Sequence, residues 1–206
     1  MSCVERSLLS PGYDVPTLNE NLDFLNVMAY DMHGYWESKA DHHSPLRLRP
    51  WDTRSSDDAV KYWISKGFSS KKIIMGIPTY GRTWTLSSDI VTPPAPAVGA
   101  GPPGPVTNET GLMAYYEICS AIKNDGWKLF KDPDQASGPY AVSPNSPITW
   151  VGFDDKTMTI TKTKYVMDNG LGGAMVWDMT TDDFRDTCGD GVYPIMKTIS
   201  NAFMRK

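Results

Sequence analysis

The 206-residue sequence predicts an α/β fold that contains part of a TIM (β/α)8 barrel. Three short apolar runs, at residues 22–31, 73–82 and 172–177, carry this prediction. Each run ends abruptly in aromatic and polar residues, and apolar runs bounded in this way are typical of strands buried on both faces, as in parallel sheets. The first two runs enclose a helical pattern, so that strand, loop, helix and strand follow one another as in one barrel unit.

The elements follow in order along the first half of the chain. Residues 1–21 are typical of a connection with one weak helical turn, because Pro-Gly and Val-Pro pairs punctuate them. A polar loop is expected over 37–53, after the first strand. The run Ser-Ser-Asp-Asp at 55–58 then predicts the start of a helix that ends at Gly67, before the second strand.

From Leu86 onward the barrel periodicity breaks down, and a run rich in Pro, Ala and Gly begins. Such a run is typical either of a flexible linker or of an ordered excursion. Patterned segments then return, and they predict a helix over 112–123, strands over 127–130 and 148–153, a helix over 155–169, the strand over 172–177 and a final helix over 193–203.

The ends of the three apolar runs indicate a function. In barrels of parallel strands and helices, the carboxyl ends of the strands hold the substrate. Here those ends carry Tyr, Trp, Asp and Arg, and flat amphipathic rings suit the apolar faces of sugars. The sequence therefore favours a sugar-binding cleft at this end of the strands.

Four motifs in the chain resemble those of glycoside hydrolase family 18, the chitinases and chitinase-like lectins. They are Met-Ala-Tyr-Asp at 28–31, Gly-Ile-Pro-Thr-Tyr-Gly-Arg at 76–82, Val-Gly-Phe-Asp-Asp at 151–155 and Gly-Gly-Ala-Met-Val-Trp at 172–177. The resemblance runs from about Gly12 to the C-terminus and covers only the C-terminal half of such an enzyme. It implies about the last three barrel strands with an inserted α+β domain.

The resemblance also implies a division of the chain into three parts. Residues 1–85 are expected to form a barrel segment of two strands and a helix. Residues 86–155 correspond to the α+β insertion, which favours the ordered excursion over the linker. Residues 156–206 supply the final barrel helix, strand and C-terminal helix.

The acid that such enzymes use is missing from the sequence. Family members cleave β-1,4-linked N-acetylglucosamine by a substrate-assisted retaining reaction, in which a glutamic acid in an Asp-x-x-Asp-x-Asp-x-Glu segment protonates the leaving oxygen. None of the five glutamates of this chain has Asp two residues before it. We therefore expect no catalytic proton donor, and no hydrolysis by this chain alone.

The supporting half of the site remains, and the resemblance implies a role for each member. Tyr30 is expected to support the reaction by donating its hydroxyl to the acetamido oxygen. Stacking roles fall to Trp177, as the floor of the subsite, and to Trp36, on the aglycone side. The other expected contacts with the sugar come from Met28, Asp31, Tyr80, Arg82 and Glu109.

Each of these assignments has a purely structural alternative. Tyr30 and Asp31 can instead satisfy backbone groups at a strand end, and Trp177 can belong to the barrel core. The alternative for Arg82 is a salt bridge with Asp31, which is compatible with sugar binding. Trp36 and Glu109 likewise have a structural alternative to sugar binding.

Three cysteines, Cys3, Cys119 and Cys188, allow one pair and one remainder. The resemblance implies a disulfide between Cys119 and Cys188, whereas reduced thiols would be expected in a cytosolic chain. Asn108 begins an Asn-Glu-Thr sequon and is a candidate for N-glycosylation. The resembling family is mostly extracellular, although the first residues of this chain do not have the pattern of a secretory signal.

Composition excludes several other classes. The content of 40% hydrophobic and 21% charged residues is ordinary for a globular protein. A net charge of −4 argues against nucleic acid as a partner, and no run approaches the ~20 apolar residues of a membrane span. The spacing of His33, His42 and His43 fits no recurrent zinc pattern, so we expect a solvated loop there and neither a metal nor a cofactor.

Three interpretations stay open. The chain is the C-terminal portion of a chitinase, or a non-catalytic lectin that binds chitin or chitooligosaccharides, or an inactive truncation. Under the last interpretation, self-association through uncovered barrel edges is an alternative, because unpaired strand edges invite pairing.

Overall fold

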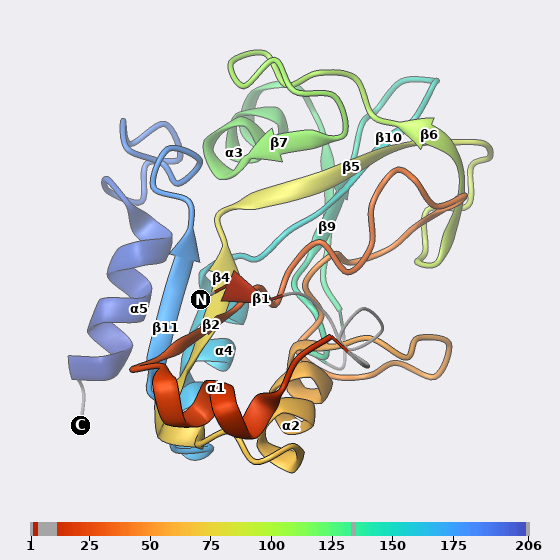
Figure 1. Ribbon diagram of the computed structural model, residues 1–206. Coiled ribbons are helices and arrows are strands. Elements are labelled where there is room, and N and C mark those ends of the chain that lie inside the picture. The colour runs from red at the N-terminus through yellow and green to blue at the C-terminus, as the bar shows by residue number, and fades with distance from the viewer. Residues whose placement is uncertain (1, 4–11, 133–134, 205–206) are drawn as a thin grey trace.

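The fold contains two open sheets (Figure 1). The structure, a computed structural model, describes residues 2–3, 12–132 and 135–204. One sheet is parallel, and the first and last described segments of the chain belong to it or lie beside it (Figure 1). The other is largely antiparallel and lies beyond the carboxyl ends of the parallel strands. The chain passes directly from the first sheet to the second, where β4 continues through Thr79 into β5.

The parallel sheet is built from the apolar runs that the sequence identified. Its strand order in the described part of the chain is β1-β2-β4-β11, comprising β1 (Ser2–Cys3), β2 (Leu25–Val27), β4 (Ile73–Pro78) and β11 (Gly173–Trp177). Leu25 pairs with Ile73, and Trp177 pairs with Pro78. The strands β2, β4 and β11 therefore run parallel, with their carboxyl ends toward the same edge of the sheet.

Helices connect and cover these strands. They are α1 (Val15–Asn21), α2 (Ser56–Ser65), the 3-10 turn η2 (Ser70–Lys72), α4 (Lys156–Asp168) and α5 (Pro194–Met204). Side-chain caps start two of them as predicted, because Ser55 accepts from the Asp58 amide and Asp155 accepts from the Met158 amide. Figure 1 shows α5 running alongside β11.

The second sheet contains strands from residues 86–155, the expected insertion, and two strands that begin outside that range. Its order is β3-β6-β5-β10-β9-β8, with β7 paired to β5, and the bounds are β3 (Lys39–Ala40), β5 (Tyr80–Leu86), β6 (Ala95–Ala100), β7 (Leu112–Ala114), β8 (Lys128–Phe130), β9 (Tyr140–Val142) and β10 (Thr149–Gly152). Helix α3 (Tyr115–Asn124) packs beside it. This sheet therefore begins before residue 86, and the division into domains at 86–155 stays a prediction.

The two sheets share a core instead of packing as separate units. One buried cluster contains Trp63 of α2, Met75 of β4 and Ile118 of α3, together with Val151 of β10. A smaller cluster fills the second sheet, where the ring of Trp150 stacks on that of Tyr140 with 5.2 Å between centroids. The shared cluster fixes the insertion on the carboxyl ends of the parallel strands.

A disulfide joins Cys119 of α3 to Cys188, in the loop before α5, and this pairing is the one that the resemblance implied. It closes a segment of 69 residues, so it ties the insertion to the loop that follows β11. Cross-links over loops of this length restrict the unfolded chain and typically contribute about 4 kcal/mol in the chain-entropy model.

Several expected elements differ from those observed. Residues 15–21 form the regular helix α1, where only a weak turn was expected, because Asp14 accepts from the Thr17 amide and caps it. Residues 112–114 belong to strand β7, so the helix expected over 112–123 begins only at Tyr115. Strand β1 was also missed, because a two-residue strand has no periodicity to detect.

The expectation of a solvated histidine loop was wrong. His33, His42 and His43 are all buried, as are Asp41 and Arg49 of the same segment. Part of the polar network in this segment joins residues far apart in the chain, such as His33 and Asp52, and a local polarity pattern does not reveal such pairs. No helix in the described ranges has the length and apolar character that crossing a membrane demands.

Candidate functional site

A cleft of about 690 Å³ opens where the parallel strands end and the insertion begins. Residues expected from the sequence line it together with others that were not expected: Asp31, Tyr80, Arg82, Thr107, Glu109, Leu112, Tyr116, Trp177, Asp178, Met179, Thr180, Thr181, Phe184 and Tyr193. The side chains come from the segment after β2, from β5, from residues 107–116, from the end of β11 and from the loop that follows β11. Both walls of the cleft therefore depend on the junction of the two sheets.

An ion pair between Asp31 and Arg82 forms the polar centre of the cleft. Arg82 donates from Nε to Asp31 Oδ1 at 2.7 Å and from Nη2 to Oδ2 at 2.8 Å. The Tyr80 hydroxyl donates to the same Oδ1 at 2.7 Å, and His43 Nδ1 lies 3.5 Å from it. The bidentate geometry fixes the planes of both groups, which makes them a rigid polar surface.

Electrostatics keep this pair ionised. Burial alone would raise the pKa of Asp31, but the hydrogen bonds and positive charges of His43 and Arg82 outweigh it and lower that pKa. Burial likewise opposes the charge of Arg82, yet its pKa is raised by the bond to Asp31. Both groups are therefore charged at neutral pH and can bond to hydroxyl or amide groups of a ligand.

Tyr30 brings an unused hydroxyl to this region. Its ring packs edge-on against Tyr80, with 6.2 Å between centroids, and lies so close to Gly76 that a Cβ there would approach the ring to 2.7 Å. Within the part of the chain that the structure describes, the buried Tyr30 Oη has no hydrogen-bond partner. Burial, with the charges of Asp31 and Asp178, raises the pKa of Tyr30 to about 12. The hydroxyl therefore stays protonated and can donate a hydrogen bond to an acceptor on a ligand.

The carboxyl end of β11 supplies an open aromatic surface. Trp177 is 54% exposed although it ends a strand of the parallel sheet, so the alternative of plain barrel core does not describe it. Next to it, Asp178 accepts from the Thr180 amide at 2.7 Å, and the Thr79 hydroxyl donates to the Asp178 carbonyl at 2.6 Å. These bonds hold the segment after Trp177 in place.

The remaining expected residues lie at or below the rim. Glu109 Oε1 is 4.0 Å from Arg82 Nη1, and its side chain is largely exposed. Trp36 is exposed and does not line the cleft, but the Arg82 guanidinium lies 5.7 Å from its ring centroid. Met28 packs against the cluster that contains Tyr30 and Tyr80, beneath the polar centre. Their roles in ligand binding stay predictions.

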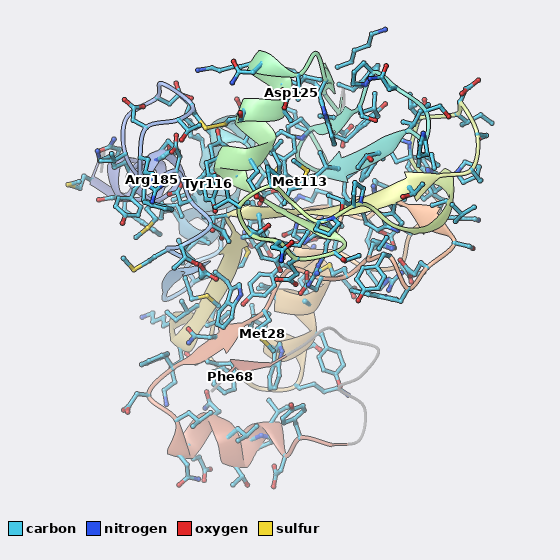
Figure 2. The ribbon with its side chains drawn as sticks, turned by 90° about the horizontal axis from the view of Figure 1, so that it is seen from above. Met28, Phe68, Met113, Tyr116, Asp125 and Arg185 are labelled. Atoms are coloured by element: carbon cyan, nitrogen blue, oxygen red, sulfur yellow. A yellow bond between two sulfur atoms is a disulfide. The ribbon has the colours of Figure 1, made fainter. Side chains whose placement is uncertain are left out.

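Residues from the insertion and the loop after β11 were missed by the sequence. Tyr116 and Phe184 pack edge-to-face with 5.7 Å between centroids, and they separate the cleft from a smaller hollow of about 150 Å³. Figure 2 shows Tyr116 beside Arg185, and both line this hollow. Tyr116 belongs to helix α3, and no pattern in a single sequence marks it or Phe184 as facing a cleft.

A buried charge network adjoins the loop that carries Trp36. His33 bonds to Glu37 Oε2 at 2.8 Å and to Asp52 Oδ2 at 3.1 Å. Arg54 donates to Glu37 at 2.6 Å, and Arg49 donates to Asp52 at 2.9 Å. The arginines supply the positive charge that these carboxylates need, so ion pairing by itself explains the cluster.

This network predicts a pH-dependent contribution to stability. Burial opposes protonation of His33, but the bond to Asp52 and its charge prevail and raise the pKa of His33 above 6.5. Because the folded-state pKa exceeds the unfolded one, the contribution is complete below the unfolded pKa and is lost as the pH rises through the folded pKa. We expect the loss of unfolding free energy in His33→Gln to be larger near about pH 5.5 than near about pH 8.5. Urea unfolding at both pH values measures it, and equal losses would contradict the charge assignment.

The comparisons with known proteins agree with this geometry. The parallel sheet, its covering helices and the cleft at the strand ends are those of a TIM-barrel-related α/β protein. The family model of glycosyl hydrolases family 18 matches residues 1–182, and the chain belongs to that family.

Three relatives place the chain within the family. Human chitinase-3-like protein 2 is 41% identical over 206 residues, which cover 96% of this chain and 51% of the relative. Catalytic domain 2 of the group II chitinase of Ostrinia furnacalis superposes with a TM-score of 0.94 at 35% identity, covering 100% of this chain and 54% of that one. Human YKL-39, described as a pseudo-chitinase with retained chitooligosaccharide binding, gives a TM-score of 0.86 at 41% identity, covering 93% and 53%. The chain thus spans about half the length of these relatives.

Proposed function

We propose that the cleft binds chitooligosaccharides, the oligomers of β-1,4-linked N-acetylglucosamine. The observation that carries this proposal is the half-exposed ring of Trp177 in one cleft with the Asp31–Arg82 pair. A flat ring beside a charged, bidentate pair suits a sugar, whose faces are apolar and whose rim carries hydroxyl and amide groups. Binding in the related YKL-39 supports the same ligand class.

Each side chain has a role in this proposal. Trp177 stacks beneath a sugar ring, and Met28 packs below the same subsite. Asp31 accepts from sugar hydroxyls, and the Tyr30 hydroxyl donates to the acetamido oxygen, which supplies the acceptor that its buried Oη otherwise lacks. Tyr80, Arg82 and Glu109 contact amide or hydroxyl groups from the side of the insertion, while Trp36 stacks on the aglycone side.

In a full-length parent, these residues form the C-terminal half of a chitinase site. Substrate-assisted retaining hydrolysis needs the acetamido group of the substrate to be held in place, to which Tyr30 contributes, and a carboxylic acid that protonates the leaving oxygen. The sequence contains no Asp-x-x-Asp-x-Asp-x-Glu segment, so this chain binds without hydrolysing. A lectin-like, non-catalytic protein of the YKL-39 kind is the second candidate, favoured by the open Trp177 ring.

The proposal includes the architecture that presents the site. The strands β2, β4 and β11 correspond to the last three of a (β/α)8 barrel, and the insertion over 86–155 supplies the second wall. Uncovered edges of the parallel sheet leave self-association as an alternative arrangement. The disulfide between Cys119 and Cys188 favours an oxidising, extracellular location.

Calorimetric titration with the tetramer of N-acetylglucosamine tests the proposal. We expect saturable binding by the wild type and a loss of at least about tenfold in affinity for Trp177→Ala, because a stacking surface is removed. Trp51→Ala is the matched control, since Trp51 is 52% exposed but lies outside the cleft. Equal affinities of wild type and Trp177→Ala would contradict the proposed site. Hydrolysis of a chromogenic chitobiose substrate by the wild type would contradict the absence of a proton donor.

A further inference from the structure

The sequon Asn108-Glu109-Thr110 lies on the rim of the cleft. Thr107 and Glu109, on either side of Asn108, both line the cleft. Asn108 itself is exposed and adopts a positive φ of 52°, a conformation that asparagine tolerates better than most residues. Thr110, the hydroxyl residue of the sequon, is also exposed. The acceptor side chain is therefore accessible at a turn.

The loop that carries the sequon is held firmly. At its base, the Gly111 amide donates to the Gly101 carbonyl at 3.1 Å. In its middle, the amides of Val106 and Thr107 donate to Glu117 Oε1 at 2.7 and 2.9 Å, and the Glu117 carboxylate is buried. A group attached to Asn108 would therefore start from a fixed point beside the cleft instead of from a mobile loop.

We propose that Asn108 carries an N-linked glycan and that this glycan restricts access of long oligosaccharides to the cleft. An N-linked glycan is a bulky, hydrated group whose first residues are N-acetylglucosamine. The disulfide between Cys119 and Cys188 supports passage through the oxidising compartment in which such glycans are added. The restriction rests on the proposed function, whereas occupancy of Asn108 does not.

The position of the glycan determines which ligands it affects. Asn108 stands between two residues that line the cleft, Thr107 and Glu109, whereas Trp177 ends β11 and Asp31 follows β2. A disaccharide held against Trp177, at the end of β11, is short enough to avoid the glycan. A hexamer that continues past Glu109 meets it and loses contacts with that rim. The glycan therefore makes the cleft selective for short ligands or free ends.

Two substitutions at Thr110 separate the glycan from the side chain. Thr110→Ala destroys the sequon, whereas Thr110→Ser preserves it, and Thr110 does not line the cleft. The full chain and both variants are secreted from eukaryotic cells behind a cleavable signal and are analysed by intact mass and glycopeptide mapping. Each is then titrated with the dimer and the hexamer of N-acetylglucosamine.

We expect a glycan on the wild type and on Thr110→Ser, and none on Thr110→Ala. Thr110→Ala is expected to bind the hexamer at least about fivefold more tightly than the glycosylated forms, with equal affinities for the dimer. An unmodified Asn108 in the secreted wild type, or equal hexamer affinities, would overturn the inference. If no form binds either ligand while the glycan is present, the proposed function and the restriction fail together, and the modification alone stands.

Discussion

Replacing Lys162 by methionine lowers the free energy of unfolding by about 3–5 kcal/mol, because it leaves the carboxylate of Asp154 buried without its partner. The side chains of both residues are almost completely buried, and Lys162 Nζ lies 2.5 Å from Asp154 Oδ2. The same ammonium donates to the carbonyl and to the hydroxyl of Ser44 at 2.7 and 2.6 Å. One cation thus joins α4 to the segment after β10 and to the loop between β3 and α2.

The control for this result lies on the same helix. Lys164 pairs with Asp168, but both side chains are largely exposed, so Lys164→Met should change the free energy of unfolding by less than about 1 kcal/mol. The double variant Lys162→Met, Asp154→Leu removes both charges and should recover part of the loss. Denaturant unfolding of the three variants measures the differences. Equal effects of Lys162→Met and Lys164→Met would refute the assigned role of the buried pair.

Replacing Asp31 by asparagine is expected to weaken chitooligosaccharide binding by about tenfold to a hundredfold, since bonds to a charged group contribute about 1.5–3 kcal/mol. Asparagine keeps the shape of the side chain and tolerates the positive φ of 60° at this position. The substitution removes the negative charge to which Arg82 and Tyr80 donate hydrogen bonds. Sugar hydroxyls then meet a weaker acceptor and a less constrained guanidinium.

Asp52→Asn is the matched control for Asp31→Asn. Asp52 also accepts from an arginine and a histidine, but it lies outside the cleft, so its replacement should leave the affinity unchanged. Asp31 should stay ionised between about pH 5 and 8, because its pKa is lowered from 3.8. Its titration should therefore not change the affinity of the wild type over this range. If Asp31→Asn binds the oligosaccharide as tightly as the wild type does, the ion pair is not part of the binding site.

Much of the parallel sheet was predictable, because its signal is local. The apolar runs of β2, β4 and β11 can be recognised without knowing which strands they pair with. The caps Ser55 and Asp155 likewise mark the starts of α2 and α4. The second sheet was harder to predict. Strand β6 lies in a run rich in Pro, Ala and Gly, and its pairing with β5 supplies the order that its own side chains do not indicate.

The candidate site shows the same division. The motif residues Asp31, Tyr80, Arg82 and Trp177 lie together in one cleft, as the resemblance implied. By contrast, nothing in the sequence around Asp154 indicates that its carboxylate pairs with the buried Lys162. Partners far apart in the chain, such as His33 and Asp52, leave no pattern in a single sequence.

The most direct test of the proposed function is a calorimetric titration of the wild-type chain with two tetramers that differ only at the acetamido group, those of N-acetylglucosamine and of glucose, both β-1,4-linked. The unpartnered Tyr30 hydroxyl and the Asp31–Arg82 pair predict saturable binding of the first tetramer and at least about tenfold weaker binding of the second. Equal affinities for the two, or no binding of either, would contradict a cleft that recognises N-acetylated sugars.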